Sequence, residues 1–89
     1  MVRVAFTDNL TRHVSCTAQE VHASTVRDAF DAVFSDRGRA RRYVLDEHGA
    51  LRKHMVVFLN GDPIADRVTL SDAVRDGDEI FVMQALSGG

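Results

Sequence analysis

EIFVMQALSGG, residues 79–89, closes the chain with a short apolar run, residues 80–83, that leads into a terminal diglycine. A short apolar run that follows a tight turn is typical of a strand, and we place this strand over residues 79–83. The two terminal glycines carry no Cβ, so this end fits a slot too narrow for any other residue. Its carboxylate is an anion at neutral pH and can attack the α-phosphate of ATP held by an enzyme. The sequence thus indicates a strand that leads into a reactive terminus.

The composition is that of an ordinary soluble globular protein of one domain, with 89 residues, 45% of them hydrophobic and 27% charged. No apolar run approaches the roughly 20 residues that span a bilayer, and the N-terminus lacks the apolar core of a signal peptide. The single cysteine fits a reducing compartment. We therefore expect a cytoplasmic protein with no membrane partner.

Charge is distributed unevenly along the chain. Residues 1–55 contain nine Lys and Arg against seven Asp and Glu, whereas residues 56–89 contain two against six. The half that carries the tail is therefore acidic. This argues against nucleic acid as the main partner and predicts docking on a basic protein surface.

Two strands are predicted at the N-terminus from alternating apolar residues, Val2, Val4 and Phe6 in the first and Val14, Cys16 and Ala18 in the second. A short polar link between them indicates an antiparallel hairpin. On this pattern Cys16 faces inward, and we expect it to be a small buried hydrophobe rather than a nucleophile.

The period changes at Thr25, a capping residue with an acid, Asp28, three positions later. Apolar residues then recur at helical spacing, at Val26, Ala29, Phe30, Val33 and Phe34. We predict a helix of about three turns that ends near Asp36, with Gly38 as its stop, and that lies across the hairpin.

Residues 37–55 show the least regular pattern. They open with a basic run, Arg37, Arg39, Arg41 and Arg42, which we interpret as a solvated face rather than a site for phosphates or an acidic partner. Residues 46–49 indicate a turn. The apolar residues of this connection are predicted to form a satellite of the core, namely Tyr43, Val44, Leu45 and Leu51.

The C-terminal half continues with a buried strand over residues 55–59, closed by Asn60-Gly61-Asp62 and ended by Pro63. Residues 69–74 suggest one short helical turn, and residues 76–78 a tight turn before the last strand. Alternation predicts that Phe58, Phe81 and Met83 share the outward face of the sheet and form an apolar patch for partner docking. The alternative is that the 37–55 connection covers this patch.

The sequence offers no catalytic constellation. His13, His22, His48 and His54 lack metal-ligand spacing, no glycine loop suits phosphate, and no Ser/His/Asp or Cys/His set can be assembled. We expect no metal, no cofactor and no enzymatic activity of the chain's own.

The order strand, strand, helix, strand, short helical turn, strand, with a terminal diglycine, resembles the MoaD/ThiS-type ubiquitin-like sulfur carrier family. The resemblance covers nearly the whole chain and rests on five stretches, residues 2–6, 25–29, 56–62, 76–80 and 87–89. It implies an α+β, β-grasp (ubiquitin-like) fold: a mixed sheet of four to five strands, the first and last parallel at its centre, with one main helix packed across it. Residues 1–84 would form the domain, and residues 85–89 a flexible tail.

The resemblance further implies that Gly89 is adenylated by a ubiquitin-activating-like adenylyltransferase, using ATP, and becomes a thiocarboxylate. Leu86, Ser87 and Gly88 would thread into the partner, and a sulfur-acceptor enzyme would take the sulfur for cysteine, molybdopterin or another cofactor. The chain would be monomeric when free. The long 37–55 connection is similar to that of CysO-like carriers, which serve a route to cysteine.

Two alternatives stay open. The first is a ubiquitin-like modifier conjugated through Gly89 to target lysines, which needs the same fold and the same activation. The second is a plain interaction domain with an incidental tail.

Overall fold

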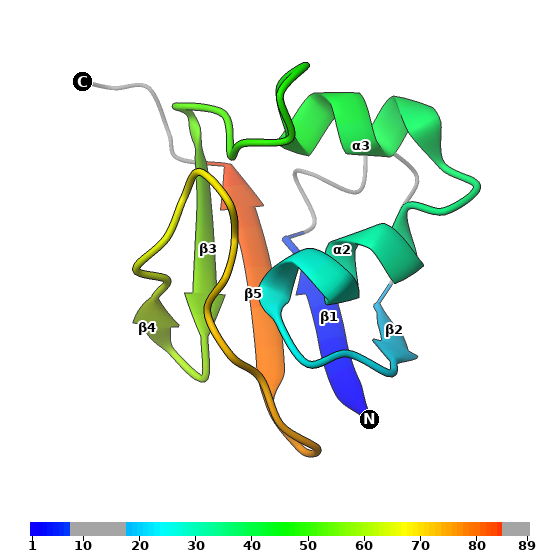
Figure 1. Cartoon of the computed structure of the whole chain (residues 1–89), viewed down its shortest axis with the longest axis vertical. Helices are drawn as coiled ribbons and strands as arrows, with labels where there is room; N and C mark the ends of the chain where they lie inside the picture. The colour runs from blue at the N-terminus through cyan, green and yellow to red at the C-terminus, as the bar shows by residue number, and fades with distance from the viewer. Residues whose placement is uncertain (8–17, 85–89) are drawn as a thin grey trace.

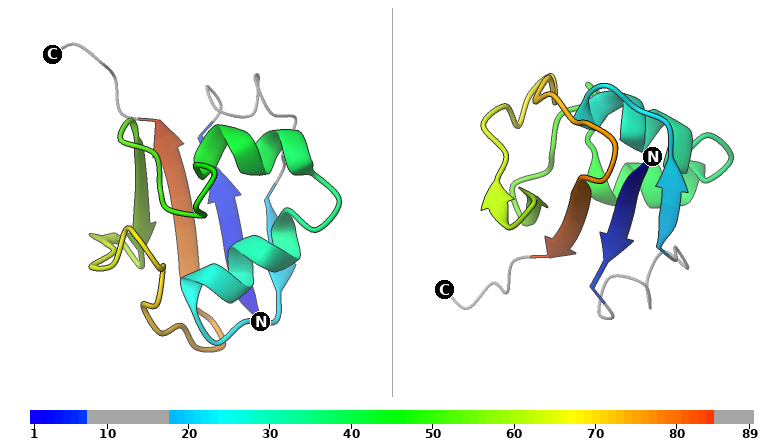
Figure 2. Two further views of the ribbon diagram at one scale, coloured as in Figure 1. Left: turned by 45° about the horizontal axis from the view of Figure 1, so that its top comes forward. Right: turned by 90° about the horizontal axis from the view of Figure 1, so that it is seen from below.

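The computed structural model describes residues 1–7 and 18–84. These residues form a five-stranded mixed sheet in the order β2-β1-β5-β3-β4, with two helices on one of its faces (Figures 1 and 2). In chain order the elements are β1 (Val2–Phe6), β2 (Gln19–Val21), α2 (Val26–Val33), α3 (Gly38–Val44), β3 (Met55–Leu59), β4 (Asp62–Pro63) and β5 (Glu79–Gln84). Neither helix is long and apolar enough to cross a membrane.

The centre of the sheet is the parallel pair of β1 and β5, as the resemblance implied, with Val4 opposite Ile80. β3 runs antiparallel to β5 on its other side, with Val57 opposite Val82. At the β3–β4 turn Asn60 and Gly61 both have positive φ, 52° and 91°. A two-residue turn of this kind joins antiparallel strands and favours Asn-Gly, so this part of the prediction is confirmed.

The hairpin at the N-terminus differs from the prediction in the place of its second strand. β2 is antiparallel to β1, with Val2 opposite Val21, so the strand lies beyond Ala18. Ala18 itself is exposed rather than inward-facing. Val14 and Cys16 lie outside the described residues.

The core lies between the helices and the inner face of the sheet. α2 begins where predicted, because the backbone N–H of Asp28 donates a 3.1 Å hydrogen bond to Thr25 Oγ1. Its Phe30 is fully buried and stacks with Phe34, with ring centroids 5.5 Å apart. Burial of one such aromatic side chain contributes about 1.5 to 3 kcal/mol. The helix ends at Val33, three residues before the predicted Asp36.

A second helix, α3, lies in the connection of residues 37–55, where the sequence shows no regular pattern. Gly38 is its first residue, so the prediction that Gly38 stops the preceding helix is wrong. The predicted β-grasp fold is confirmed, and α3 accompanies the main helix α2 on the same face of the sheet. Ala40 and Val44 are buried on one side of α3. Leu45 and Leu51 join the same core, and Tyr43 packs against it, so the predicted satellite of the core is confirmed.

The helical turn predicted for residues 69–74 is also wrong. Leu70 has φ of 57° with its side chain fully buried, and Ala73 forms a bridge with Thr25. The segment is therefore not helical, and it runs beside the start of α2, where Val74 N donates to Ser24 O.

Candidate functional site

The candidate site begins where β5 ends, at Gln84. Gln84 lies opposite Met55, the first residue of β3. The hydroxyl of Tyr43, on α3, donates a 3.0 Å hydrogen bond to Gln84 Oε1. A helix and a neighbouring strand therefore hold the root from which the C-terminal residues continue.

The tail proper, residues 85–89, lies outside the described residues. The expected roles of Leu86, Ser87, Gly88 and Gly89 thus stay predictions. A five-residue segment spans at most about 17 Å when fully extended, so the terminal carboxylate is confined to about that distance from Gln84.

The second part of the site is the sheet face that carries no helix. The right-hand view of Figure 2, which looks at the molecule from below, shows both helices on the other side of the sheet. On this face Phe58 of β3 lies directly opposite Phe81 of β5, and Met83 lies opposite Val56. All four side chains are half-buried, whereas Val57, between Val56 and Phe58, is 1% exposed. We call Phe58, Phe81 and Met83 the outer-face patch. The structure brings these three residues together as alternation predicted, and their role in docking stays a prediction.

The alternative explanation of the outer-face patch, that residues 37–55 cover it, is wrong. α3 lies with α2 on the opposite face of the sheet (Figure 2). Its Ala40 and Val44 belong to the core cluster that includes Ile80 and Val82 of β5, the inward neighbours of Phe81 and Met83.

Tyr43 is a site residue that the sequence did not indicate, since it was predicted only as part of the core. It reaches Gln84 across 41 positions of sequence. Its ring also meets the edge of the His54 ring, with centroids 6.2 Å apart and planes at 89°. No local pattern could have paired these residues, because the contact exists only once α3 is laid beside the start of β3.

Asp66 organises the loop between β4 and β5. Its carboxylate accepts hydrogen bonds from the backbone N–H of Val68 and Thr69, at 3.0 and 2.9 Å, and from the hydroxyls of Ser71 and Thr69. These bonds, that of Ser71 first, hold the pKa of Asp66 far below its usual value. The carboxylate is thus a structural centre and not an acid for catalysis near neutral pH.

Two further carboxylates are engaged at the start of β5. The N-terminal ammonium of Met1 bonds Asp76 Oδ1 at 2.8 Å and lowers the pKa of Asp76. The side-chain amide of Asn60 and the backbone N–H of Arg75 lower the pKa of Asp78. Both groups fix loop ends rather than form a reactive pair.

The remaining candidates bring no second site. Within residues 1–7 and 18–84, no group of three or more His, Cys, Asp and Glu side chains is placed to hold a metal ion. The basic run lies along α3, where Arg41 pairs with Asp31 at 2.9 Å and Arg39 and Arg42 are exposed. His13 and Cys16 lie outside the described part of the chain.

A five-stranded mixed sheet with a parallel central pair, helices on one face and a C-terminus that continues from the central strand defines a ubiquitin-like protein of β-grasp fold. The particular family follows from the sequence comparison. The ThiS family matches residues 9–89, most of the chain, and the chain belongs to this family of ubiquitin-like sulfur carriers.

Solved structures agree with this fold. SAMP1 from Haloferax volcanii is 26% identical, with a TM-score of 0.80 over 99% of this chain and 98% of that one. CysO in the BexX/CysO complex of Amycolatopsis orientalis is 24% identical, with a TM-score of 0.81 over 100% of both chains. Mycobacterium tuberculosis CysO is 17% identical, with a TM-score of 0.79 over 97% of this chain and 100% of that one. No curated protein sequence matches the chain significantly.

Proposed function

We propose that this chain is a sulfur carrier whose terminal Gly89 carboxylate is adenylated and then converted to a thiocarboxylate. The observation that carries the proposal is the continuation of the central strand β5, in a ThiS family member, into a five-residue tail that ends in Gly88-Gly89. The chain offers the reacting carboxylate, and a partner adenylyltransferase supplies ATP and the catalytic groups.

The chemistry proceeds in two displacements. A carboxylate oxygen of Gly89 first attacks the α-phosphorus of ATP, and pyrophosphate leaves. Hydrosulfide, HS⁻, then attacks the acyl carbon, AMP leaves with the electron pair of the broken C–O bond, and the thioacid that forms loses its proton to water. The resulting thiocarboxylate donates its sulfur to an acceptor enzyme for the synthesis of cysteine, molybdopterin or another cofactor.

The domain and the tail have different roles in this reaction. Residues 1–84 form the rigid domain that partners recognise, and residues 85–89 form the tether that reaches the partner's active site. Leu86 and Ser87 set the register of the tether, and Gly88 and Gly89 allow entry into a narrow slot.

The outer-face patch is the proposed docking surface for the activating enzyme. Its two phenylalanines lie opposite each other on neighbouring strands, and aromatic side chains of this kind are enriched at the cores of protein interfaces. The complex of Amycolatopsis orientalis CysO with BexX supports docking of a partner protein on a domain of this fold. That similarity also supports the CysO-like branch.

A second candidate function is that of a protein modifier. The similarity to SAMP1, a small archaeal modifier protein, favours it. In that case the acyl-adenylate of Gly89 would pass, through the activating machinery, to a lysine amine of a target protein instead of to sulfur.

Intact-protein mass spectrometry tests the proposal. The full chain is incubated with ATP, a sulfide source and activating enzymes from its own genome. Replacement of the terminal C–OH by C–SH adds about 16 Da, and we expect this gain on the last peptide alone. Isopeptide conjugates in cell lysate that depend on Gly88-Gly89, without any such gain, would establish the modifier instead.

Two variants sharpen this experiment. Deletion of Gly88 and Gly89 is expected to abolish the mass gain, because the remaining carboxylate is shorter in reach and sits on Ser87. Gly88→Ala keeps the length and the terminal carboxylate and adds only one Cβ. We expect it to lose most of the gain if the partner's slot is narrow, and full conversion of Gly88→Ala would contradict steric threading.

A further inference from the structure

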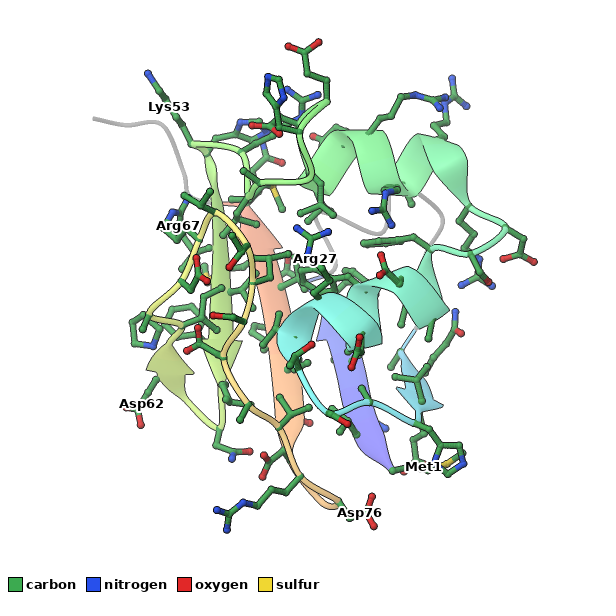
Figure 3. All side chains as sticks on the ribbon, viewed as in Figure 1. Met1, Arg27, Lys53, Asp62, Arg67 and Asp76 are labelled. Carbon is green, nitrogen blue, oxygen red and sulfur yellow. The ribbon has the colours of Figure 1, made fainter. Side chains whose placement is uncertain are left out.

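The carboxylates of the C-terminal third lie away from the root of the tail. Figure 3 shows Asp62 and Asp76 at the opposite end of the molecule from Lys53. β5 separates the two ends, because it starts at Glu79 and finishes at Gln84, about 17 Å further along. The acidic excess of residues 56–89 therefore does not surround the tail root.

Most of these carboxylates also have partners within the fold. Five of the six accept hydrogen bonds or form ion pairs, namely Asp66, Asp72, Asp76, Asp78 and Glu79. The expectation that an acidic half docks on a basic surface is thus not supported by where these residues lie.

The root of the tail is instead flanked by positive charge. Lys53 and His54 immediately precede Met55, the residue opposite Gln84, and both are exposed. Arg52 lies beside the end of α3, where its Nε donates a 2.7 Å hydrogen bond to Arg42 O. We call Arg42, Arg52, Lys53 and His54 the tail-root basic group.

Among the described residues, this group is neutralised only in part. No carboxylate of residues 1–7 and 18–84 lies within ion-pair distance of Arg42, Arg52 or Lys53. The acid that shares an open pocket with Arg52 and Lys53 is Asp46. Asp46 uses one oxygen to close its own turn, accepting the backbone N–H of His48 and of Ala50 at 2.8 and 3.0 Å. The backbone N–H groups of Ala50 and His48 lower the pKa of Asp46, and the positive charge of Arg52 adds to that effect.

The tail-root basic group adjoins the outer-face patch. Met83 precedes Gln84, and its opposite residue Val56 follows Met55, so the patch reaches the same end of the sheet. A partner that covers the patch and this end of the sheet therefore meets Lys53 at the rim of the contact, whereas Arg42 lies with α3 on the helix side of the same end. A polar rim around an apolar centre is the usual anatomy of a protein interface.

We propose that the tail-root basic group docks against an acidic rim of the activating enzyme, beside the apolar surface that receives the outer-face patch. The inference rests on the proposed function and names the chemistry of its partner. Guanidinium and ammonium groups pair with carboxylates, and such complementarity speeds association and fixes orientation. This fixed orientation directs the C-terminal tail toward the active-site slot of the activating enzyme.

The anions that the tail-root basic group can reach in the complex are carboxylates of the partner protein rather than the phosphates of ATP. A tail threaded into a narrow slot is extended, which places Gly89 about 17 Å from Gln84. Lys53, at the root, is then too far from the nucleotide to contact it.

A matched pair of charge reversals tests the inference. Lys53→Glu alters the tail-root basic group, whereas Arg75→Glu makes the same change in net charge at an exposed residue. Arg75 adjoins Asp76, which Figure 3 shows at the opposite end of the molecule. We expect Lys53→Glu to raise the KM for the carrier in ATP-dependent adenylation about ten-fold at low ionic strength, with kcat unchanged, and Arg75→Glu to stay within about two-fold. The difference should shrink in about 0.5 M salt, which screens exposed charges.

Zero-length cross-linking gives an independent readout. Lys53 is the one lysine of the chain, so the chain's amines are its ε-amine and the α-amine of Met1, which pairs with Asp76 at the far end. A carbodiimide joins amines to carboxylates in contact with them. We expect cross-links from Lys53 to Asp or Glu of the activating enzyme, also with a chain that lacks Gly88 and Gly89. Lys53→Arg should lose the cross-link and keep the wild-type KM.

The outcomes separate the two proposals. A wild-type chain that no activating enzyme adenylates overturns the proposed function, and this inference with it. A wild-type chain that is adenylated, while Lys53→Glu and Arg75→Glu have equal KM values or the cross-links run through Met1, overturns this inference alone.

Discussion

Asp66 shows how one side chain can decide the path of a loop. Its carboxylate binds the backbone and hydroxyls of residues two to five positions ahead, and Asp72 binds the N–H groups of Ala65 and Asp66 in return. Such local side-chain bonds compete with a helical turn for the same backbone donors. They explain why residues 69–74, which show an acceptable helical pattern, do not form a helix.

The low pKa of Asp66 predicts how the stability of the fold depends on pH in the acid range. A carboxyl whose pKa is lowered by folding contributes stability that is fully present above its unfolded pKa, near 3.8, and is lost as the pH falls toward the folded value. The melting temperature should therefore be flat above about pH 5 and fall below about pH 4. Asp66→Asn should lower it by several degrees at pH 7 and weaken its further fall in acid, as measured by circular dichroism.

Asp62→Asn is the control for Asp66→Asn, because Asp62 is exposed on β4 with no bond to another described side chain. It should keep the wild-type melting temperature at every pH. An Asp66→Asn protein with the wild-type acid profile would show that the hydrogen-bonded carboxylate does not stabilise the loop.

At the scale of elements, the sequence predicted what alternation and capping encode. β1 follows from apolar alternation, β3 and β5 from short apolar runs next to turns, and the start of α2 from the Thr25 cap. α3 was missed because it lacks these signals: its N-cap, Arg37, makes no capping bond, and its first turn holds no acid. The spacing of Ala40, Tyr43 and Val44 was the one pattern that could have indicated it.

Arg27 connects α2 to two loops that the sequence could not place beside it. Its Nε donates a 2.8 Å hydrogen bond to Thr69 O, and its Nη2 donates a 2.9 Å bond to Gly49 O. A guanidinium can hold two carbonyls at a fixed angle, whereas an ammonium cannot reproduce that geometry. Arg27→Lys should therefore lower the free energy of unfolding by about 1 to 2 kcal/mol in urea denaturation.

Arg39→Lys makes the same chemical change on an exposed face of α3, where no hydrogen bond of the Arg39 side chain ties it to other described residues. It should change the free energy of unfolding by less than about 0.5 kcal/mol. Equal losses for the two variants would mean that Arg27 does not join α2 to these loops.

At the scale of the whole molecule, the candidate site combines what sequence could and could not predict. Alternation placed Phe58 and Phe81 on the outward face, because Val57 and Ile80 had to face the core. The parallel pairing of β1 with β5 came from the resemblance, since local pattern carries no strand order. The position of Lys53 beside Gln84 depends on the register of β3 against β5, which only the assembled sheet fixes.

The last prediction concerns the outer-face patch. If the patch is a docking surface, a substitution within it slows adenylation, whereas a substitution on ordinary surface does not. Phe81→Ser removes an aromatic side chain from the patch while its inward neighbours Ile80 and Val82 stay buried. We expect a loss of about 1 to 2 kcal/mol in stability, from a cross-strand aromatic pair and partial burial. The kcat/KM for adenylation should fall by about ten-fold or more, as for a central interface residue.

Val68→Ser is the matched control, since Val68 is 66% exposed in the loop before β5 and lies outside the outer-face patch. It removes apolar surface without touching the patch, and we expect wild-type adenylation. If Phe81→Ser folds, as its circular dichroism would show, and is adenylated as fast as Val68→Ser, then the patch does not dock the activating enzyme. Recognition would then depend on the tail-root basic group and the tail, and the half-buried aromatic pair would serve only to hold β3 against β5.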